Sequence, residues 1–359
     1  ERGQAAADRI NAQIASDPTP SHRGSARFVP LDLANFSSVD GFVRTVSTPR
    51  AQQGEDAVQP RRFGPIAGIV LNAGIIALDG WAVTVADGME RTLQVNHLSH
   101  QHLVTSLLEQ NESAASKSPL LSRQLRVVSV SSWVPSRGAA RGPAETGGVV
   151  HWTSPHNYPT EMEPIFHGAY GATKQHNIRF ARELARRYES VRSYSLHPGL
   201  ISTALGVKRG GGIASALNRW GAAGFWWVAG HFVSVKTISE GAATSVHCAV
   251  IGWGASIGDD VGGRGEFYDD ARLSPFPRDE DNDSSEAGRR ERERMDEACW
   301  ESSAELIRRG RSGEFLRGGR SSSSLSASSA TTSLIHDAVT SLACHVGAYA
   351  CLFSVADHL

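Results

Sequence analysis

The chain has 359 residues, of which 40% are hydrophobic, so it is long and apolar enough to bury one large core with extensions. A formal net charge of −1, with no basic stripe interleaved with aromatic residues, excludes a general electrostatic attraction to nucleic acid. The four cysteines show no Cys-x-x-Cys spacing, and His97 and His100 have no acidic or cysteine partner nearby in the sequence. This pattern predicts reduced thiols, a cytoplasmic protein and no metal site.

Three continuous apolar runs, each closing on a small or polar turn, follow one another along the chain at helix-length intervals. Such runs are typical of parallel strands that are buried on both faces. Strands that alternate with helices predict an α/β fold with a doubly wound parallel sheet of the Rossmann type. The runs are Ile66–Leu71, closing on Asn72-Ala73-Gly74; Leu125–Ser132, ending in two serine hydroxyls; and Val191–Thr203, stopped by Pro198-Gly199.

Tyr170 and Lys174 lie four residues apart at the start of an amphipathic pattern, which places the phenol and the ammonium on one helical face. A lysine held beside a tyrosine stabilises the phenolate and lowers the pKa of the phenol, so the tyrosine can exchange a proton near neutral pH. A single Tyr-x-x-x-Lys spacing also occurs by chance on solvated helices. The strand-end serines upstream and the Pro198-Gly199 turn downstream favour a catalytic role for it.

In this order the motifs resemble the short-chain dehydrogenase/reductase family, in its retinol-dehydrogenase-like and WW-domain-oxidoreductase-like branch. Members of the family move a hydride between a nicotinamide cofactor and an alcohol or carbonyl carbon, so the protein itself handles a proton and orients the oxygen. The resemblance runs from Glu1 to about Arg309 and defines one domain over residues 1–309. It is carried by Leu31-Asp32-Leu33, Asn72-Ala73-Gly74, Val95–Leu98, Val130–Ser132, Tyr170 with Lys174, Pro198-Gly199 with Thr203, Lys236–Ala242 and Gly263–Tyr268.

The resemblance implies a role for each residue of the expected catalytic site. Tyr170 is the general acid in reduction and the general base in oxidation. Ser132 hydrogen-bonds the substrate oxygen, with Ser131 as the second candidate because the two hydroxyls are adjacent. Lys174 binds the nicotinamide ribose and lowers the pKa of the tyrosine, and Asn96 holds a water molecule that links Lys174 to solvent.

The resemblance also implies a nicotinamide cofactor, NADP or NAD, with NADP favoured by the branch. The residues that choose between the two correspond to positions upstream of Glu1. Besides Tyr170 and Lys174, the expected cofactor contacts are Asp32 and Leu33 at the adenine, Asn72, Ala73 and Gly74 at the adenine ribose, and Pro198, Gly199, Ile201 and Thr203 at the nicotinamide.

Two departures from the family pattern bear on the site. Residues Arg137–His167 form an inserted loop between Ser132 and Tyr170, and the loop's own Tyr158 has no lysine four residues later. The glycine-rich turn that receives a pyrophosphate at a helix N-terminus does not precede Asp32. The domain is therefore expected to lack its first strand, first helix and second strand.

The start of the chain supports the interpretation that the sequence is a fragment. It opens on Glu1, in a segment that resembles the helix after the family's second strand, and its first methionine is Met89. A strand around Arg27 to Leu31 would lose both neighbours that connect it to Ile66–Leu71. Because an orphaned buried backbone group costs ~1–3 kcal/mol, the chain alone is expected neither to bind the pyrophosphate well nor to turn over.

Two segments lie outside the expected catalytic core. Gly210–Val235 contains several Trp and Phe residues and is expected to form an apolar lid over the substrate, with core or dimer packing as the alternative. Residues 310–359 read as a poorly ordered Ser/Gly-rich linker followed by an apolar tail. The uncharged run Val339–Ala356 is long enough for a marginal membrane span, and a frayed tail is the favoured alternative.

Together these features predict an NAD(P)-dependent oxidoreductase that acts on a small apolar alcohol or carbonyl substrate. One alternative is an enzyme like the protochlorophyllide reductases, whose distinctive cysteines have no clear counterpart here. The other is a binding or scaffold protein that kept the catalytic residues and lost the phosphate loop. The sequence leaves the substrate, the reaction direction and the oligomeric state open.

Overall fold

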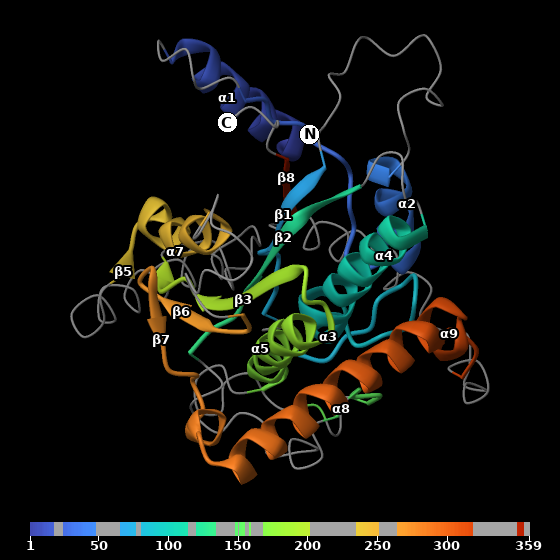
Figure 1. Cartoon of the computed structure of the whole chain (residues 1–359). Helices are drawn as coiled ribbons and strands as arrows, with labels where there is room; N and C mark the ends of the chain where they lie inside the picture. Colours follow the sequence, from blue (N-terminus) through green and yellow to red (C-terminus); the bar gives the residue numbers. More distant parts are fainter. Residues whose placement is uncertain are drawn as a thin grey trace, which may run out of the picture.

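The computed structural model describes residues 1–17, 24–47, 65–76, 80–113, 120–133, 148–149, 151–154, 158, 168–201, 235–250, 264–318 and 350–354 (Figure 1). Helices and strands alternate along most of this part of the chain. In chain order the elements are α1 (Arg2–Ser16), α2 (Phe36–Ser47), β1 (Ile66–Leu71), α3 (Arg91–Leu93), the π-helix η2 (Gln94–Leu98), α4 (Ser99–Ser113), β2 (Leu121–Val130), α5 (Ala169–Arg187), β3 (Val191–His197), β4 (Leu200–Ile201), β5 (Val235–Lys236), α7 (Ile238–Val250), β6 (Phe267–Asp269), β7 (Arg272–Ser274), η6 (Asp279–Asn282), α8 (Glu286–Arg311), α9 (Glu314–Gly318) and β8 (Ala350–Ser354).

The main sheet has the strand order β7-β6-β3-β2-β1-β8. β1, β2, β3 and β6 are parallel to their neighbours in this series, whereas β7 and β8 pair antiparallel at the two edges. The three strands expected from the apolar runs are therefore β1, β2 and β3, and they are adjacent in the sheet. Their parallel arrangement confirms the predicted doubly wound α/β fold.

Alternation along the strands sends side chains into two separate cores, one on each face of the sheet. Ile69 of β1 and Val127 of β2 join a core with α2, α4 and α5, which includes Phe180. On the other face Val128 packs with Cys248 of α7. Figure 1 shows the same layers, with α7 on one side of the sheet and α4 and α5 on the other. Burial on both faces explains why the strands are apolar without alternation.

The long helix α8 closes the layer formed by α4 and α5. Its Trp300 stacks on Phe180 of α5, with ring centroids 5.6 Å apart and an interplanar angle of 12°. The helix continues past Arg309 to Arg311, and α9 follows it, so regular structure extends beyond the boundary expected at Arg309. Within the described residues no helix is both long and apolar enough to cross a membrane.

The edge of β1 differs from the expectation. Residues 24–31 form no strand, so the strand predicted around Arg27 to Leu31 is wrong. The position beside β1 is instead taken by β8, which pairs antiparallel from Ile66↔Ser354 to Leu71↔Ala350. With this position filled from the C-terminal segment, residues 27–31 do not pair with β1. Part of the segment expected to be poorly ordered is thus paired in the sheet.

Candidate active site

Tyr170 and Lys174 lie in the first two turns of α5, which begins at Ala169. Both side chains are buried, and the Lys174 Nζ atom lies 5.3 Å from the centroid of the Tyr170 ring. The ammonium donates a hydrogen bond of 3.0 Å to the carbonyl oxygen of Val130, the last residue of β2. Burial lowers the pKa of Lys174 to about 8. The structure therefore brings the two expected residues together at the carboxyl edge of the sheet.

The two strand-end serines differ in their contacts. Ser131 donates its hydroxyl hydrogen to the backbone carbonyl of Lys174 at 2.7 Å, and its backbone N–H donates to Leu196 O at 2.7 Å. Ser131 therefore joins β2 to α5 and β3. Ser132 follows it at the end of the strand and is also buried. The role of Ser132 at the substrate oxygen stays a prediction.

Asn96 lies in η2 and ties the turn after β1 to α5. Its Oδ1 accepts the backbone N–H of Ile75 at 2.8 Å, and its Nδ2 donates to Ile75 O at 2.9 Å and to Thr173 Oγ1 at 3.1 Å. A Cβ atom placed on Gly74 would lie 3.4 Å from Lys174 Nζ and 3.6 Å from Asn96 Oδ1. The small residue thus lets the turn pass close to the lysine. The water-holding role of Asn96 stays a prediction.

The other residues expected at the adenine end have structural partners. Asp32 Oδ1 accepts the N–H of Ala34 at 2.9 Å in the turn before α2. Leu33 is fully buried, and its carbonyl accepts the Ser99 hydroxyl at 2.6 Å. In the turn after β1, Ala73 is fully buried while Asn72 is exposed. That turn lies at the β1 edge, where β8 begins with Ala350 beside Leu71.

The nicotinamide-end segment follows β3. Pro198 is half-buried, and Gly199 has φ +86°, a conformation that favours glycine. Ile201 of β4 approaches α7 so closely that a Cβ atom on Gly241 would lie 2.1 Å from its Cδ1. Thr203 and the expected lid Gly210–Val235, apart from Val235 in β5, lie outside the described residues.

Neutral histidines surround the lysine. Burial, with a smaller contribution from the charge of Lys174, lowers the pKa of His100 to about 3 and that of His197 to about 4. Both imidazoles are therefore uncharged at neutral pH. The ammonium of Lys174 is the charged group that the site directs toward Tyr170.

Sequence reasoning missed Trp133, which directly follows the two serines. Its indole Nε1 donates to Asp269 Oδ2 at 2.9 Å, and its ring packs edge-on against Phe267 at 5.7 Å. The side chain is thus fixed at the carboxyl edge of β6. An aromatic residue after a Ser-Ser pair carries no signal of this contact, because Asp269 lies 136 residues away.

The described part of the inserted loop packs away from the lysine. Tyr158 lies with its hydroxyl 3.3 Å from Glu90 Oε1, and His151 Nε2 accepts the backbone N–H of Glu90 at 3.3 Å. These contacts place them at the N-terminus of α3. They agree with the choice of Tyr170 over Tyr158. The remainder of the loop lies outside the described residues.

A cavity of ≈ 590 Å³ lies at the opposite end of α5, where it meets α2, α4 and α8. Arg187, Tyr188 and Trp300 line it, together with Gln101 and His102. Neither Tyr170 nor Lys174 is among its lining residues, so it is separate from the candidate active site.

The chain is similar in sequence to known oxidoreductases. The WW domain-containing oxidoreductase of Drosophila melanogaster is 30% identical over 254 residues, which cover 69% of this chain and 50% of that protein. Human retinol dehydrogenase 11 is 36% identical over 185 residues, which cover 51% of this chain and 47% of that protein. The chain belongs to the short-chain dehydrogenase/reductase family. Its relatives place it in the branch of the retinol dehydrogenases and WW-domain oxidoreductases.

The extent of these matches is limited. The chain spans about half the length of the curated relatives that it matches. No protein-family model matches it. Among solved structures, a 3-oxoacyl-[acyl-carrier protein] reductase from Brucella melitensis in complex with NAD has a TM-score of 0.43 at 18% identity, covering 74% of this chain and 81% of that chain.

Proposed function

We propose that this short-chain dehydrogenase/reductase is an NAD(P)-dependent oxidoreductase that acts on an apolar alcohol or carbonyl compound. The observation that carries the proposal is the Tyr170–Lys174 pair on α5, with Lys174 Nζ fixed to the end of β2 directly before the two serines. Retinol dehydrogenase 11 and a daunorubicin C-13 ketoreductase of Streptomyces are among the similar proteins, and their names support an alcohol or ketone substrate.

In the proposed reduction, the Tyr170 phenol donates its proton to the substrate oxygen, and in oxidation the phenolate accepts it. The Ser132 hydroxyl donates a hydrogen bond to the same oxygen and orients it. The positive charge of Lys174, 5.3 Å from the ring centroid, stabilises the phenolate. A bound nicotinamide would supply or accept the hydride.

The nicotinamide end of the site fits such a cofactor better than the pyrophosphate end. An ammonium has three donor hydrogens, and Lys174 directs one of them to Val130 O, so others are available for ribose hydroxyls. Gly74 keeps the adjacent turn free of a side chain. In the described residues no glycine-rich turn opens a helix beside β1, so we assign no residues to the pyrophosphate. NADP is proposed ahead of NAD from the branch alone.

Tyr170→Phe is the direct test, with decanal as the substrate and NADPH or NADH as the reductant. Loss of the proton donor should lower kcat by about 100-fold or more. Tyr158→Phe is the matched control, because Tyr158 contacts Glu90 at the N-terminus of α3, and it should retain activity. Where the unmodified chain reduces decanal, equal activity of Tyr170→Phe would contradict the proposed role.

Cofactor binding separates the enzyme from the scaffold alternative. Titration of the full chain with NADPH and NADH should quench its tryptophan fluorescence if the chain binds the nicotinamide. A chain that leaves the fluorescence unchanged with both would favour the scaffold alternative.

A further inference from the structure

A buried series of hydrogen bonds connects Lys174 to the C-terminal helix α8. The carbonyl oxygen of Val130 receives two side chains from α5: Lys174 Nζ at 3.0 Å and Asn177 Nδ2 at 3.3 Å. Asn177 then meets His97 Nδ1 with its Oδ1 at 3.3 Å, and His97 Nε2 lies 2.8 Å from the hydroxyl oxygen of Ser303. This series of hydrogen bonds therefore joins β2, α5, η2 and α8.

The directions of the outer hydrogen bonds follow from the geometry. The amide nitrogen of Asn177 donates to the Val130 carbonyl, so its oxygen faces His97 Nδ1. At the other end the Ser303 hydroxyl donates to Cys299 O at 2.7 Å, so its oxygen faces His97 Nε2 as an acceptor. His97 thus lies between two acceptor oxygens, and its neutral imidazole donates its one hydrogen to either of them.

All side chains in this series of hydrogen bonds are buried, so each polar group depends on its hydrogen-bond partner. His97 and Ser303 are at most 1% exposed, Asn177 is 2% exposed and Lys174 is 3% exposed. A polar group at this depth without a partner costs free energy, so a change at one link disturbs the next. None of these contacts belongs to the direct pairing of Tyr170 with Lys174.

We propose that Asn177, His97 and Ser303 are positioning residues that hold the Val130 carbonyl against the Lys174 ammonium. Helix α8 thereby contributes to the site through Ser303, although its residues touch neither Tyr170 nor Lys174 in the described contacts. The proposal rests on the role of Lys174 in the proposed function. Its test nevertheless reads the lysine directly and requires no turnover.

The experiment is an NMR titration of the full chain labelled with ¹³C only at lysine. The chain has four lysines, Lys117, Lys174, Lys208 and Lys236, so the Cε signals are few, and Lys174→Arg assigns the one of interest. Among the described residues, the titratable groups that face Lys174 are Tyr170, His100 and His197, and they are unchanged in all test variants. A hydrogen bond to the charged form raises the pKa of an amine, so losing it lowers the titration midpoint.

Asn177→Leu should lower the Lys174 midpoint by about 0.5 pH unit or more. Ser303→Ala should lower it less, and Ser303→Thr, which keeps the hydroxyl, should restore it. Ser302→Ala is the matched control: Ser302 also bonds backbone in α8, but it contacts Val149 rather than His97. It should leave the midpoint unchanged.

An unchanged or raised Lys174 midpoint in both Asn177→Leu and Ser303→Ala would overturn the proposal. It would mean that Asn177 only competes with the lysine for the Val130 carbonyl. If Asn177→Leu does not fold, as judged by circular dichroism, the comparison of Ser303→Ala with Ser302→Ala decides alone. Failure of the chain to bind NADPH would contradict the proposed function but would leave this readout intact.

Discussion

Three histidines, His97, His100 and His176, lie in the interior between α5, α8 and the segment around η2. The rings of His97 and His176 are 5.3 Å apart. Burial lowers the pKa of His97 to about 4 and that of His100 to about 3, and it lowers the pKa of His176 well below the ordinary value. All three imidazoles are therefore neutral in the folded protein at pH 7, and acid must charge them against burial.

This burial predicts acid destabilisation. An unfolded histidine binds a proton below pH 6.5, whereas folded His97 resists protonation until about pH 4. The stability it contributes is present above pH 6.5 and is lost as the pH falls toward 4, by up to about 3 kcal/mol. Urea unfolding followed by circular dichroism should show this decline, and His97→Gln should make it shallower. An identical pH dependence of the two proteins would contradict the assignment.

At the scale of single residues, the sequence allows contacts to be predicted for residues that share a helix face or follow the end of a strand. Tyr170 and Lys174 could be paired from their spacing, and Ser131 and Ser132 from their place after a buried strand. The link from Asn177 through His97 to Ser303 could not be predicted, because His97 and Ser303 are 206 positions apart and meet only after α8 packs. A buried histidine has no local pattern that separates it from a surface one.

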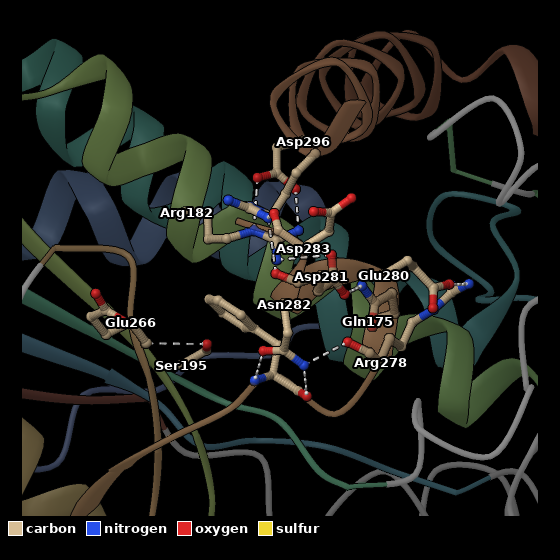
Figure 2. A network of polar contacts seen from close by, with 12 residues as sticks. Gln175, Arg182, Ser195, Glu266, Arg278, Glu280, Asp281, Asn282, Asp283 and Asp296 are labelled. Atoms are coloured by element: carbon tan, nitrogen blue, oxygen red, sulfur yellow. Dashed lines mark hydrogen bonds and ion pairs between the residues drawn. The ribbon is translucent and has the colours of Figure 1, made fainter. Parts of the chain in front are cut away.

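At the scale of elements, an ionic cluster fastens α5 to α8 and η6 (Figure 2). Arg182 of α5 makes two hydrogen bonds, of 2.7 and 2.6 Å, to the carboxylate of Asp296 in α8. It also pairs with Asp281 of η6 at 3.0 Å, and Gln175 donates to the same carboxylate at 2.9 Å. Asp281 and Asp296 are buried and the Arg182 side chain is only 9% exposed, so the guanidinium offsets the cost of holding two carboxylates in the interior.

Arg182→Met should therefore destabilise the protein by about 3–5 kcal/mol, since it leaves two buried carboxylates without their partner. The matched control is Arg294→Met on the exposed face of α8, where Arg294 pairs with exposed Glu291, and it should leave the stability essentially unchanged. Chemical denaturation of both variants measures the difference. Similar losses in the two would mean that the cluster is no more than a surface network.

Two helical glycines test how closely α8 packs. A Cβ atom on Gly310 of α8 would lie 2.7 Å from Cε2 of buried Phe36, whereas the nearest atom to a Cβ on Gly41 of α2 is 3.7 Å away. Gly310→Ala should destabilise by about 1–3 kcal/mol through overpacking. Gly41→Ala should stabilise by about 1 kcal/mol because alanine favours the helix. Thermal unfolding of both variants measures the two signs, and a stabilising Gly310→Ala would contradict the close packing.

The elements that could be predicted are those whose apolar pattern is fixed by burial on both faces. Strand β1 matches the expected Ile66–Leu71, while β2 begins four positions before the expected Leu125, at Leu121. The strand expected at Arg27 to Leu31 rested on the family pattern and not on a pairing partner. A strand forms only where a neighbouring strand pairs with it through hydrogen bonds. The sequence alone does not predict which segment will be that neighbouring strand.

For the whole molecule, the main difference from the expectation is the sheet edge at β1. The sequence contains the parallel series β1, β2, β3 as three buried runs, but the pairing of β8 with β1 joins segments about 280 residues apart. Non-local antiparallel pairing leaves no periodic signal in either segment. From the sequence alone the apolar run that includes β8 therefore reads as a tail, and only the fold shows its place at the sheet edge.

Because β8 supplies hydrogen bonds along β1, ending the chain after Gly318 should expose that edge. Each lost hydrogen bond is worth about 1 kcal/mol, so amides of β1 that face β8 should exchange with deuterium about fivefold faster or more. Ending the chain after Ser354 retains β8 and is the matched control. Amides of β3, between β2 and β6, should be unaffected in both. Equal exchange of β1 in the two shortened chains would contradict the pairing, whereas selective loss of protection in the shorter one would establish that the C-terminal segment completes the sheet edge beside the site.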